Sequence, residues 1–286
     1  MKEQSIKTPN NEGKEDEVLF TRHSRAKYAT YGEVIKSENP QSSHDPNKQL
    51  ENDLPEAGIE LAKKKAEKLF NSMDSEKDAL FFVSSKEMRA FETAKIYKEI
   101  AAQRDFEIIL SHKKKNKEMK SGMAKKMADE NIRAIDSLSL KIPNQLVGNI
   151  FNPEAYLGEI NWEAVDDETK EKWEKARKII DAGDQGSWGA NFYKHSEAIQ
   201  KIFPEIKSSR DEYETSFGKL LKLTKFAQDK INEAGYNKNV KVMAFGHENY
   251  MGTALNEYLG DHNLGNCETV SIDIDDDGNE VLEKMN

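Results

Sequence analysis

Three stretches of the chain place basic side chains at the end of a short apolar run or a few residues beyond it. In VLFTRHSR, Arg22 and His23 follow Val18–Thr21, and in VMAFGHENYMGTAL, His247 follows a second apolar run. In FFVSSKEMRAFETA, Arg89 lies near the start of a segment with helical spacing. Guanidinium groups and the backbone N–H groups at a helix start are suited to binding a phosphate or a carboxylate. The three stretches therefore predict an anion site, provided that the fold brings them together.

Five runs rich in apolar or β-branched residues predict strands. They are Val18–Thr21, Ala79–Ser84, Phe106–Leu110, Val240–Phe245 and Thr269–Ile274. Helical spacing of apolar residues over Pro55–Phe70 and Lys86–Ala102 predicts helices between the first three strands. Alternating strands and helices favour parallel pairing, and parallel strands place their carboxyl ends at one edge of the sheet. We therefore expect Arg22 with His23, Arg89 and His247 to converge at that edge.

The predicted fold class is α/β, with three layers in which helices flank a mainly parallel central sheet. Residues 1–16 are polar and without apolar periodicity, which predicts a disordered N-terminal tail, so the domain is expected to span 17–286. Strand signals fade from about residue 125 to 235, where ETKEKWEKARKII and YETSFGKLLKLTKFAQDKINEAG are typical of amphipathic helices. A helical insertion over about 123–236, partly covering the predicted site, is therefore expected.

Composition narrows the possible partners and compartments. The net charge of −9 argues against nonspecific nucleic-acid binding, which needs a cationic surface. Cys267 is the only cysteine, so neither an intrachain disulfide framework nor a cysteine-based zinc cluster is possible. The first residues lack the apolar core of a signal peptide, and no run approaches membrane-spanning length. We expect a cytoplasmic protein without nucleic-acid or membrane partners.

An acidic segment near the C-terminus resembles the start of a calcium-binding loop. The segment Asp273–Gly278 matches the first six positions of such a loop. The last position of the loop, which should be a glutamate that binds calcium through both oxygens, is Lys284, and Glu283 lies one position too early. A strand precedes the segment, and an Asp-Gly pair before Glu280–Leu282 favours a turn. The sequence therefore predicts a terminal hairpin and no metal site.

Taken together and in order, the motifs resemble those of the histidine phosphatase superfamily, in its phosphoglycerate mutase-like branch 1. Arg22-His23-Ser24 is similar to the family's Arg-His-Gly, and Gly246-His247 to its Gly-His. The segment Leu54–Ala62 resembles the family's Leu-Thr-x-x-Gly helix start, and Ser84–Ala94 its second arginine motif. The resemblance covers roughly residues 17–122 and 238–283.

The resemblance implies a role for each matched residue. His23 would be the nucleophile that forms a phosphohistidine, and Arg22, Arg89 and His247 would bind the phosphoryl oxygens. No metal or cofactor is implied. Ser24 replaces the family's glycine, so either its hydroxyl joins the phosphate hydrogen bonds or the turn differs slightly.

A carboxylic acid must protonate the leaving oxygen, and two candidates arise from the resemblance. Glu118, in KEMKSG, stands where the family often carries an acid followed by glycine, and is the preferred candidate. Glu248 is the alternative, because a more distant branch places its proton donor beside the second histidine. The charged run around Glu118 is otherwise typical of a solvated surface.

The expected activity is that of a metal-independent phosphomonoesterase of the histidine acid phosphatase type, acting on a small-molecule or protein phosphate ester. A phosphomutase of the same family is one alternative. Ala26, Tyr28 and Ala29 stand where mutases of the family usually carry Ser, Trp and Asn, which argues against it. A catalytically silent phosphate-binding or scaffold protein is the other alternative.

Overall fold

The computed structural model describes residues 17–26, 54–110, 123–135, 166–183, 194–202, 237–247, 263–274 and 280–285, with isolated positions between 191 and 260. The predicted tail and both candidate acids, Glu118 and Glu248, lie outside the described residues. The prediction of one domain with an insertion over about 123–236 therefore stays a prediction.

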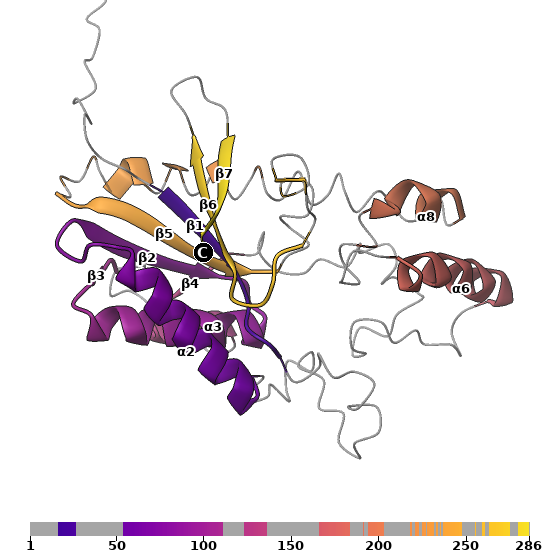
Figure 1. Cartoon of the computed structure of the whole chain (residues 1–286), viewed down its shortest axis with the longest axis horizontal. Coiled ribbons are helices and arrows are strands. Elements are labelled where there is room, and N and C mark those ends of the chain that lie inside the picture. Colours follow the sequence, from indigo (N-terminus) through magenta and orange to yellow (C-terminus); the bar gives the residue numbers. More distant parts are fainter. Residues whose placement is uncertain are drawn as a thin grey trace, which may run out of the picture.

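A mixed sheet of seven strands forms the centre of the structure (Figure 1). The strands run in the order β3-β2-β5-β1-β6-β7, and β4 pairs with β2 as well. Their bounds are β1 Glu17–Arg22, β2 Asp78–Ser84, β3 Glu107–Ile108, β4 Arg133–Ala134, β5 Asn239–Gly246, β6 Thr269–Ile274 and β7 Glu280–Met285.

Three long parallel strands end at the same level of the sheet. In the register of β1 with β5, Arg22 lies opposite Gly246, and in the register of β2 with β5, Ser84 lies opposite Phe245. β6 runs antiparallel to β1, and β7 antiparallel to β6, so these two strands complete the sheet on one side. Residues that follow β1, β2 and β5 are therefore placed at one edge, as predicted.

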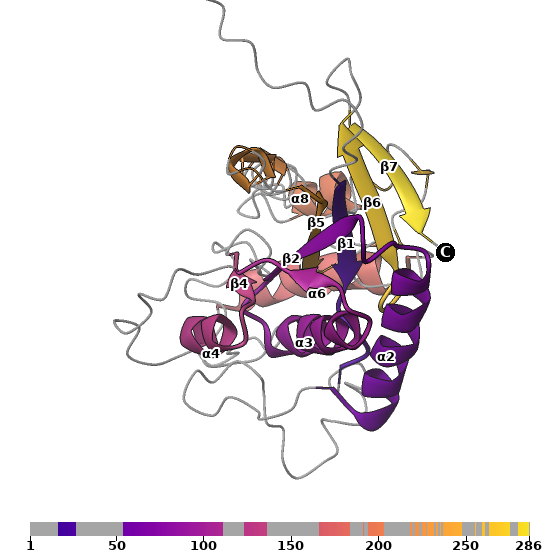
Figure 2. The same cartoon turned by 90° about the vertical axis from the view of Figure 1, so that its left-hand side faces the viewer.

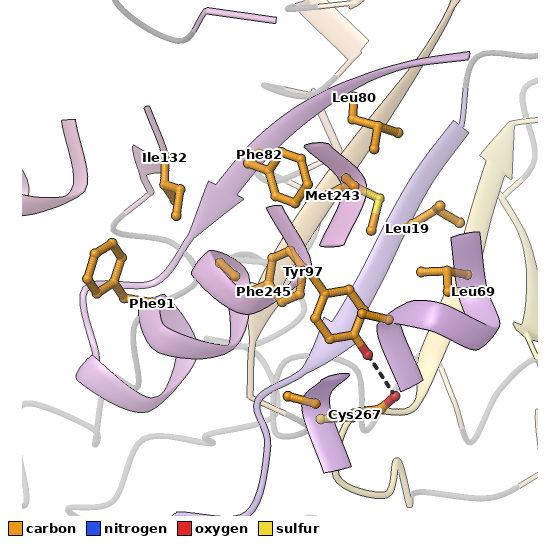
Figure 3. Close-up of a cluster of buried hydrophobic side chains, with 14 of the residues drawn as sticks. Leu19, Leu69, Leu80, Phe82, Phe91, Tyr97, Ile132, Met243, Phe245 and Cys267 are labelled. Atoms are coloured by element: carbon orange, nitrogen blue, oxygen red, sulfur yellow. Dashed lines mark hydrogen bonds between the residues drawn. The ribbon is translucent and has the colours of Figure 1, made fainter. Parts of the chain in front are cut away.

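Helices α2 (Glu56–Asn71), α3 (Met88–Gln103) and α4 (Met123–Asp129) lie on one side of the sheet (Figure 2). Side chains of the sheet such as Leu19, Phe82 and Phe245 pack there against Leu69 of α2 and Tyr97 of α3 (Figure 3). Alternation along β1 sends Val18 and Phe20 to the opposite face. There the core also includes Leu221, Leu255 and Leu264. The sheet is thus buried on both faces, which explains why its strands are continuous apolar runs.

Two further helices, α6 (Asp167–Asp181) and α8 (Ser196–Ile202), lie apart from the sheet, at the right of Figure 1. Asp166 accepts a hydrogen bond from the backbone N–H of Thr169 at 2.7 Å and so caps α6. Trp173, Ala176 and Ile180 form the buried stripe that the periodicity predicted. Whether this region covers the site stays a prediction.

Most predicted elements are confirmed, including the terminal hairpin, in which Thr269 pairs with Met285. The strand predicted over Phe106–Leu110 is shorter, because only Glu107 and Ile108 pair with β2. A strand in the region expected to be helical was missed: Arg133–Ala134 pairs with the carboxyl end of β2. Within the described residues, no helix is long and apolar enough to cross a membrane.

Candidate active site

The ends of β1 and β5 bring His23 and His247 together. The backbone N–H of His23 donates to the carbonyl of Gly246 at 2.9 Å, which extends the parallel ladder by one residue. The two imidazole rings then meet edge to face, with 4.9 Å between their centroids and an interplanar angle of 62°. The predicted convergence of these two histidines is therefore present in the structure.

His23 has one definite tautomer. Its Nδ1 lies 2.6 Å from the carbonyl oxygen of Ser24, and because a carbonyl can only accept, Nδ1 carries the proton. In the neutral ring Nε2 then holds a lone pair. Burial, followed by the charges of Arg89 and Arg22, holds the pKa of His23 well below its ordinary value of 6.5, while the bond to Ser24 opposes this shift. His23 is therefore neutral near pH 7 and nucleophilic at Nε2.

Arg89 reaches the histidines from the first turn of α3. Its Nη2 lies 3.5 Å from Nδ1 of His247, and its side chain is fully buried. A guanidinium only donates, so Nδ1 of His247 accepts and the proton of this ring lies on Nε2. That Nε2 is 3.3 Å from the hydroxyl oxygen of Ser85, the residue that follows β2. The second arginine motif thus contributes both a cation and a hydroxyl to the histidine pair.

Arg22, the last residue of β1, is fixed by the loop of residues 263–268 that precedes β6. Its Nη1 donates to the carbonyl of Leu264 at 2.5 Å. Its backbone N–H donates to Glu268 and its carbonyl accepts from Cys267, both at 3.1 Å. Arg22 is thereby placed close enough to His23 for its charge to lower the pKa of that ring.

Ser24 connects the segment that carries His23 to the start of α2. Its hydroxyl donates to the carbonyl of Gly58 at 2.6 Å. Gly58 has no space for a side chain, because a Cβ there would lie 2.3 Å from the carbonyl oxygen of Arg25. Ser24 and Gly58, one from each motif, thus allow the backbone that follows β1 to lie against the start of α2. A phosphate contact by Ser24, predicted above, stays a prediction beside this anchoring bond.

Glu87 is a site residue that the sequence prediction missed. Its carboxylate lies 3.7 Å from Nη1 of Arg89, and its side chain is 17% exposed. Its backbone N–H donates to the hydroxyl oxygen of Ser85 at 3.3 Å. The only sequence signal was its place two residues before Arg89. A carboxylate at this distance offsets part of the arginine's charge.

The arrangement combines a lone pair for attack with several groups that bind an anion. His23, Arg89 and His247 are 4%, 0% and 2% exposed, so charges act there with little screening by water. Within the part of the chain that the structure describes, no group of three or more His, Cys, Asp or Glu side chains could hold a metal ion. The site can therefore perform nucleophilic attack on an electrophilic, anionic centre such as a phosphoryl group.

The chain is similar to known proteins in structure but matches none of them in sequence searches. No protein-family model matches the chain, and no curated protein matches it in sequence. Solved structures similar to it include a phosphoglycerate mutase from Bacillus anthracis, at 14% identity and a TM-score of 0.48, covering 94% of this chain and 92% of that one.

Two phosphatases are similar at the same level. A phosphoserine phosphatase mutant from Entamoeba histolytica, in complex with phosphoserine, has 14% identity and a TM-score of 0.45, with 94% of this chain and 96% of that chain covered. The alpha-ribazole phosphatase from Shigella flexneri has 12% identity and a TM-score of 0.43, with 94% and 96% covered. These three neighbours are histidine phosphatase superfamily members. We base the function on the side chains of the site.

Proposed function

We propose that this chain is a phosphate monoester hydrolase of the histidine phosphatase superfamily and that it forms a phosphohistidine on His23. The observation that carries the proposal is the 2.6 Å bond from Nδ1 of His23 to the carbonyl of Ser24, which leaves the lone pair on Nε2. The proximity of Arg89 and His247, at 3.5 Å from each other, supports a phosphoryl group as the electrophile.

In the first step, Nε2 of His23 attacks phosphorus, and the bond from phosphorus to the ester oxygen breaks in line with the new N–P bond. Arg22, Arg89 and His247 stabilise the negative charge on the phosphoryl oxygens. The leaving oxygen takes a proton from a carboxylic acid and departs as an alcohol. Nδ1 keeps its proton and its bond to Ser24, which stabilises the positive charge that develops on the ring.

In the second step, water attacks the phosphohistidine. The water gives a proton to the carboxylate formed in the first step, the N–P bond breaks, and inorganic phosphate leaves with the ring restored to its starting tautomer. Glu118 is the proposed acid and base, with Glu248 as the alternative because it follows His247 directly. Both assignments rest on sequence position.

The test is hydrolysis of an aryl phosphate and of several natural phosphate esters in the presence of EDTA, with trapping of acid-labile phosphoprotein. Wild-type protein should release phosphate and retain a trapped phosphoryl group, and His23→Ala should lose both. His195→Ala removes a histidine of the α8 region and serves as the matched control, expected to behave as wild type.

Different results would favour the other two functions. Return of the phosphoryl group to a second hydroxyl of a phosphoglycerate, without net hydrolysis, would indicate a phosphomutase. Binding of phosphate without any trapped intermediate from any ester would indicate a catalytically silent phosphate-binding protein.

A further inference from the structure

The peptide unit between His23 and Ser24 is hydrogen-bonded by side chains at both of its ends. Its carbonyl, that of His23, accepts from Nδ2 of Asn266 at 3.1 Å. Its N–H, that of Ser24, donates to Oγ1 of Thr93 at 2.9 Å. The two partners come from different elements, the 263–268 loop and helix α3. The plane of this one peptide is therefore fixed from two directions.

Thr93 also joins this peptide to the arginine of the site. Its hydroxyl donates its own proton to the carbonyl of Arg89 at 2.7 Å, one turn earlier in α3. The Thr93 hydroxyl therefore accepts from the N–H of Ser24 and donates to the carbonyl of Arg89, so it acts as acceptor and as donor at the same time. Thr93 is fully buried, and no water is needed to complete the network.

Asn266 lies in a loop that is closed by hydrogen bonds between Gly265 and Glu268. The carboxylate of Glu268 accepts from the backbone N–H of Gly265 at 2.7 Å, and the N–H of Glu268 donates to the carbonyl of Gly265 at 3.0 Å. Cys267 adopts a φ of 56°, and its carbonyl accepts from the hydroxyl of Tyr97 at 3.4 Å (Figure 3). These bonds fix the position from which Asn266 donates.

We propose that Thr93 and Asn266 are positioning residues that set the tautomer and orientation of the His23 imidazole; this inference rests on the function proposed above. The carbonyl of Ser24 accepts the Nδ1 proton, and it lies only one peptide beyond the unit that Thr93 and Asn266 fix. Rotation of that unit moves the Ser24 carbonyl away from Nδ1. The proton is then no longer confined to Nδ1, and a ring protonated at Nε2 has no lone pair for attack on phosphorus.

Two nearly isosteric variants remove the proposed bonds. Thr93→Val removes the hydroxyl that accepts from Ser24, and Asn266→Leu removes the amide donor without adding a charge near the anion site. Thr21→Val is the matched control, because Thr21 is also a fully buried threonine and its hydroxyl bonds instead to that of Thr269 at 2.9 Å. Thr93→Ser keeps the hydroxyl and should restore the wild-type behaviour.

The measurements are the single-turnover rate of phosphohistidine formation, the affinity for sulfate, and the nitrogen-15 NMR signals of the His23 ring. We expect Thr93→Val and Asn266→Leu to slow phosphohistidine formation by about 10- to 100-fold, the range that small misplacements of a reacting group cause. Sulfate affinity should change less than about threefold, because the anion-binding side chains remain and sulfate forms no bond to Nε2, in keeping with binding and chemistry being separable. The protonated and unprotonated nitrogen signals of His23 should move toward each other as the tautomers mix. The control should show none of these changes.

Wild-type rates and wild-type nitrogen signals in both variants would overturn the inference. It would also be overturned if sulfate affinity fell in proportion to the rate, since the residues would then act on the anion and not on the nucleophile. If Thr93→Val does not fold, Asn266→Leu still tests whether this peptide unit sets the tautomer of His23. If the wild-type protein forms no phosphohistidine, the proposed function fails, whereas the tautomer of His23 remains measurable and tests the positioning independently.

Discussion

His23 and His247 meet edge to face at the ends of two adjacent parallel strands, with 4.9 Å between ring centroids. Each ring has a different hydrogen-bond partner, a backbone carbonyl for His23 and the hydroxyl of Ser85 for His247. The two histidines are therefore not equivalent. One has its lone pair on Nε2, and the other has its proton there.

The first prediction concerns the titration of His23. Because burial and the charges of Arg89 and Arg22 lower its pKa, we expect its NMR signals to titrate well below pH 6.5, and phosphohistidine formation to persist at pH 5.5. Arg89→Met should raise the pKa of His23, whereas Arg104→Met, at the end of α3, should leave it unchanged. Titration of wild-type His23 near pH 6.5 would contradict the described environment.

The second prediction concerns stability. A histidine whose pKa is lowered by folding binds a proton more readily in the unfolded state, so the free energy of unfolding falls as the pH drops below 6.5 and continues to fall until the folded pKa is reached. Above pH 6.5 this contribution is constant. Urea unfolding at pH 7.5 and 5.5 should show a smaller loss of stability for His23→Ala than for wild type. An identical loss in both proteins would remove His23 as its source.

The third prediction concerns Glu87, whose carboxylate lies 3.7 Å from Nη1 of Arg89. Glu87→Gln removes a negative charge beside the anion site and should tighten vanadate binding by about three- to tenfold, as expected for a partly screened charge. Glu76→Gln, on an exposed turn, should have no effect. A large loss of turnover with unchanged vanadate affinity would instead identify Glu87 as a proton donor.

The fourth prediction concerns Gly58. Replacing a helical glycine by alanine usually stabilises a helix by about 0.5–1 kcal/mol, but a Cβ at Gly58 would lie 2.3 Å from the carbonyl oxygen of Arg25. Gly58→Ala should therefore lower the free energy of unfolding by about 1–3 kcal/mol, the usual cost of overpacking. Gly218→Ala is the control, since nothing lies within 4 Å of its added Cβ. Equal denaturation midpoints for the two variants would show that the Ser24–Arg25 backbone can move aside.

Strands whose structure follows from their local composition could be predicted from the sequence. The runs that became β1, β2 and β5 are buried on both faces, so they are apolar along their whole length and easy to recognise. β3 and β4 have only two residues each. β3 pairs with the start of β2 and β4 with its end, so both strands depend on β2 and are a property of the assembled sheet. No local pattern could have revealed Arg133–Ala134 as a strand.

The same limit applies to the site. Arg22, His23, Arg89 and His247 were predicted because they follow strands in a recognised order. Asn266, Thr93 and Glu87 were not assigned roles, because two of them bind backbone groups of distant residues and the third has the residue type expected in any helix start. A side chain that bonds to a backbone group needs no particular residue type as its partner, so the sequence contains no matching pair that would reveal the bond.

The position of β1 between β5 and β6 has a consequence for biosynthesis. The bonded hydroxyls of Thr21 and Thr269 belong to residues 248 positions apart, so at bacterial or eukaryotic translation speeds roughly 10 to 50 s pass between their synthesis. For most of that interval, until β5 is synthesised, the first strand has neither of its neighbours, and its apolar residues have no sheet to join. The growing chain must be kept from aggregating over this period, and the candidate site gains its geometry only after β5 and the 263–268 loop have left the ribosome.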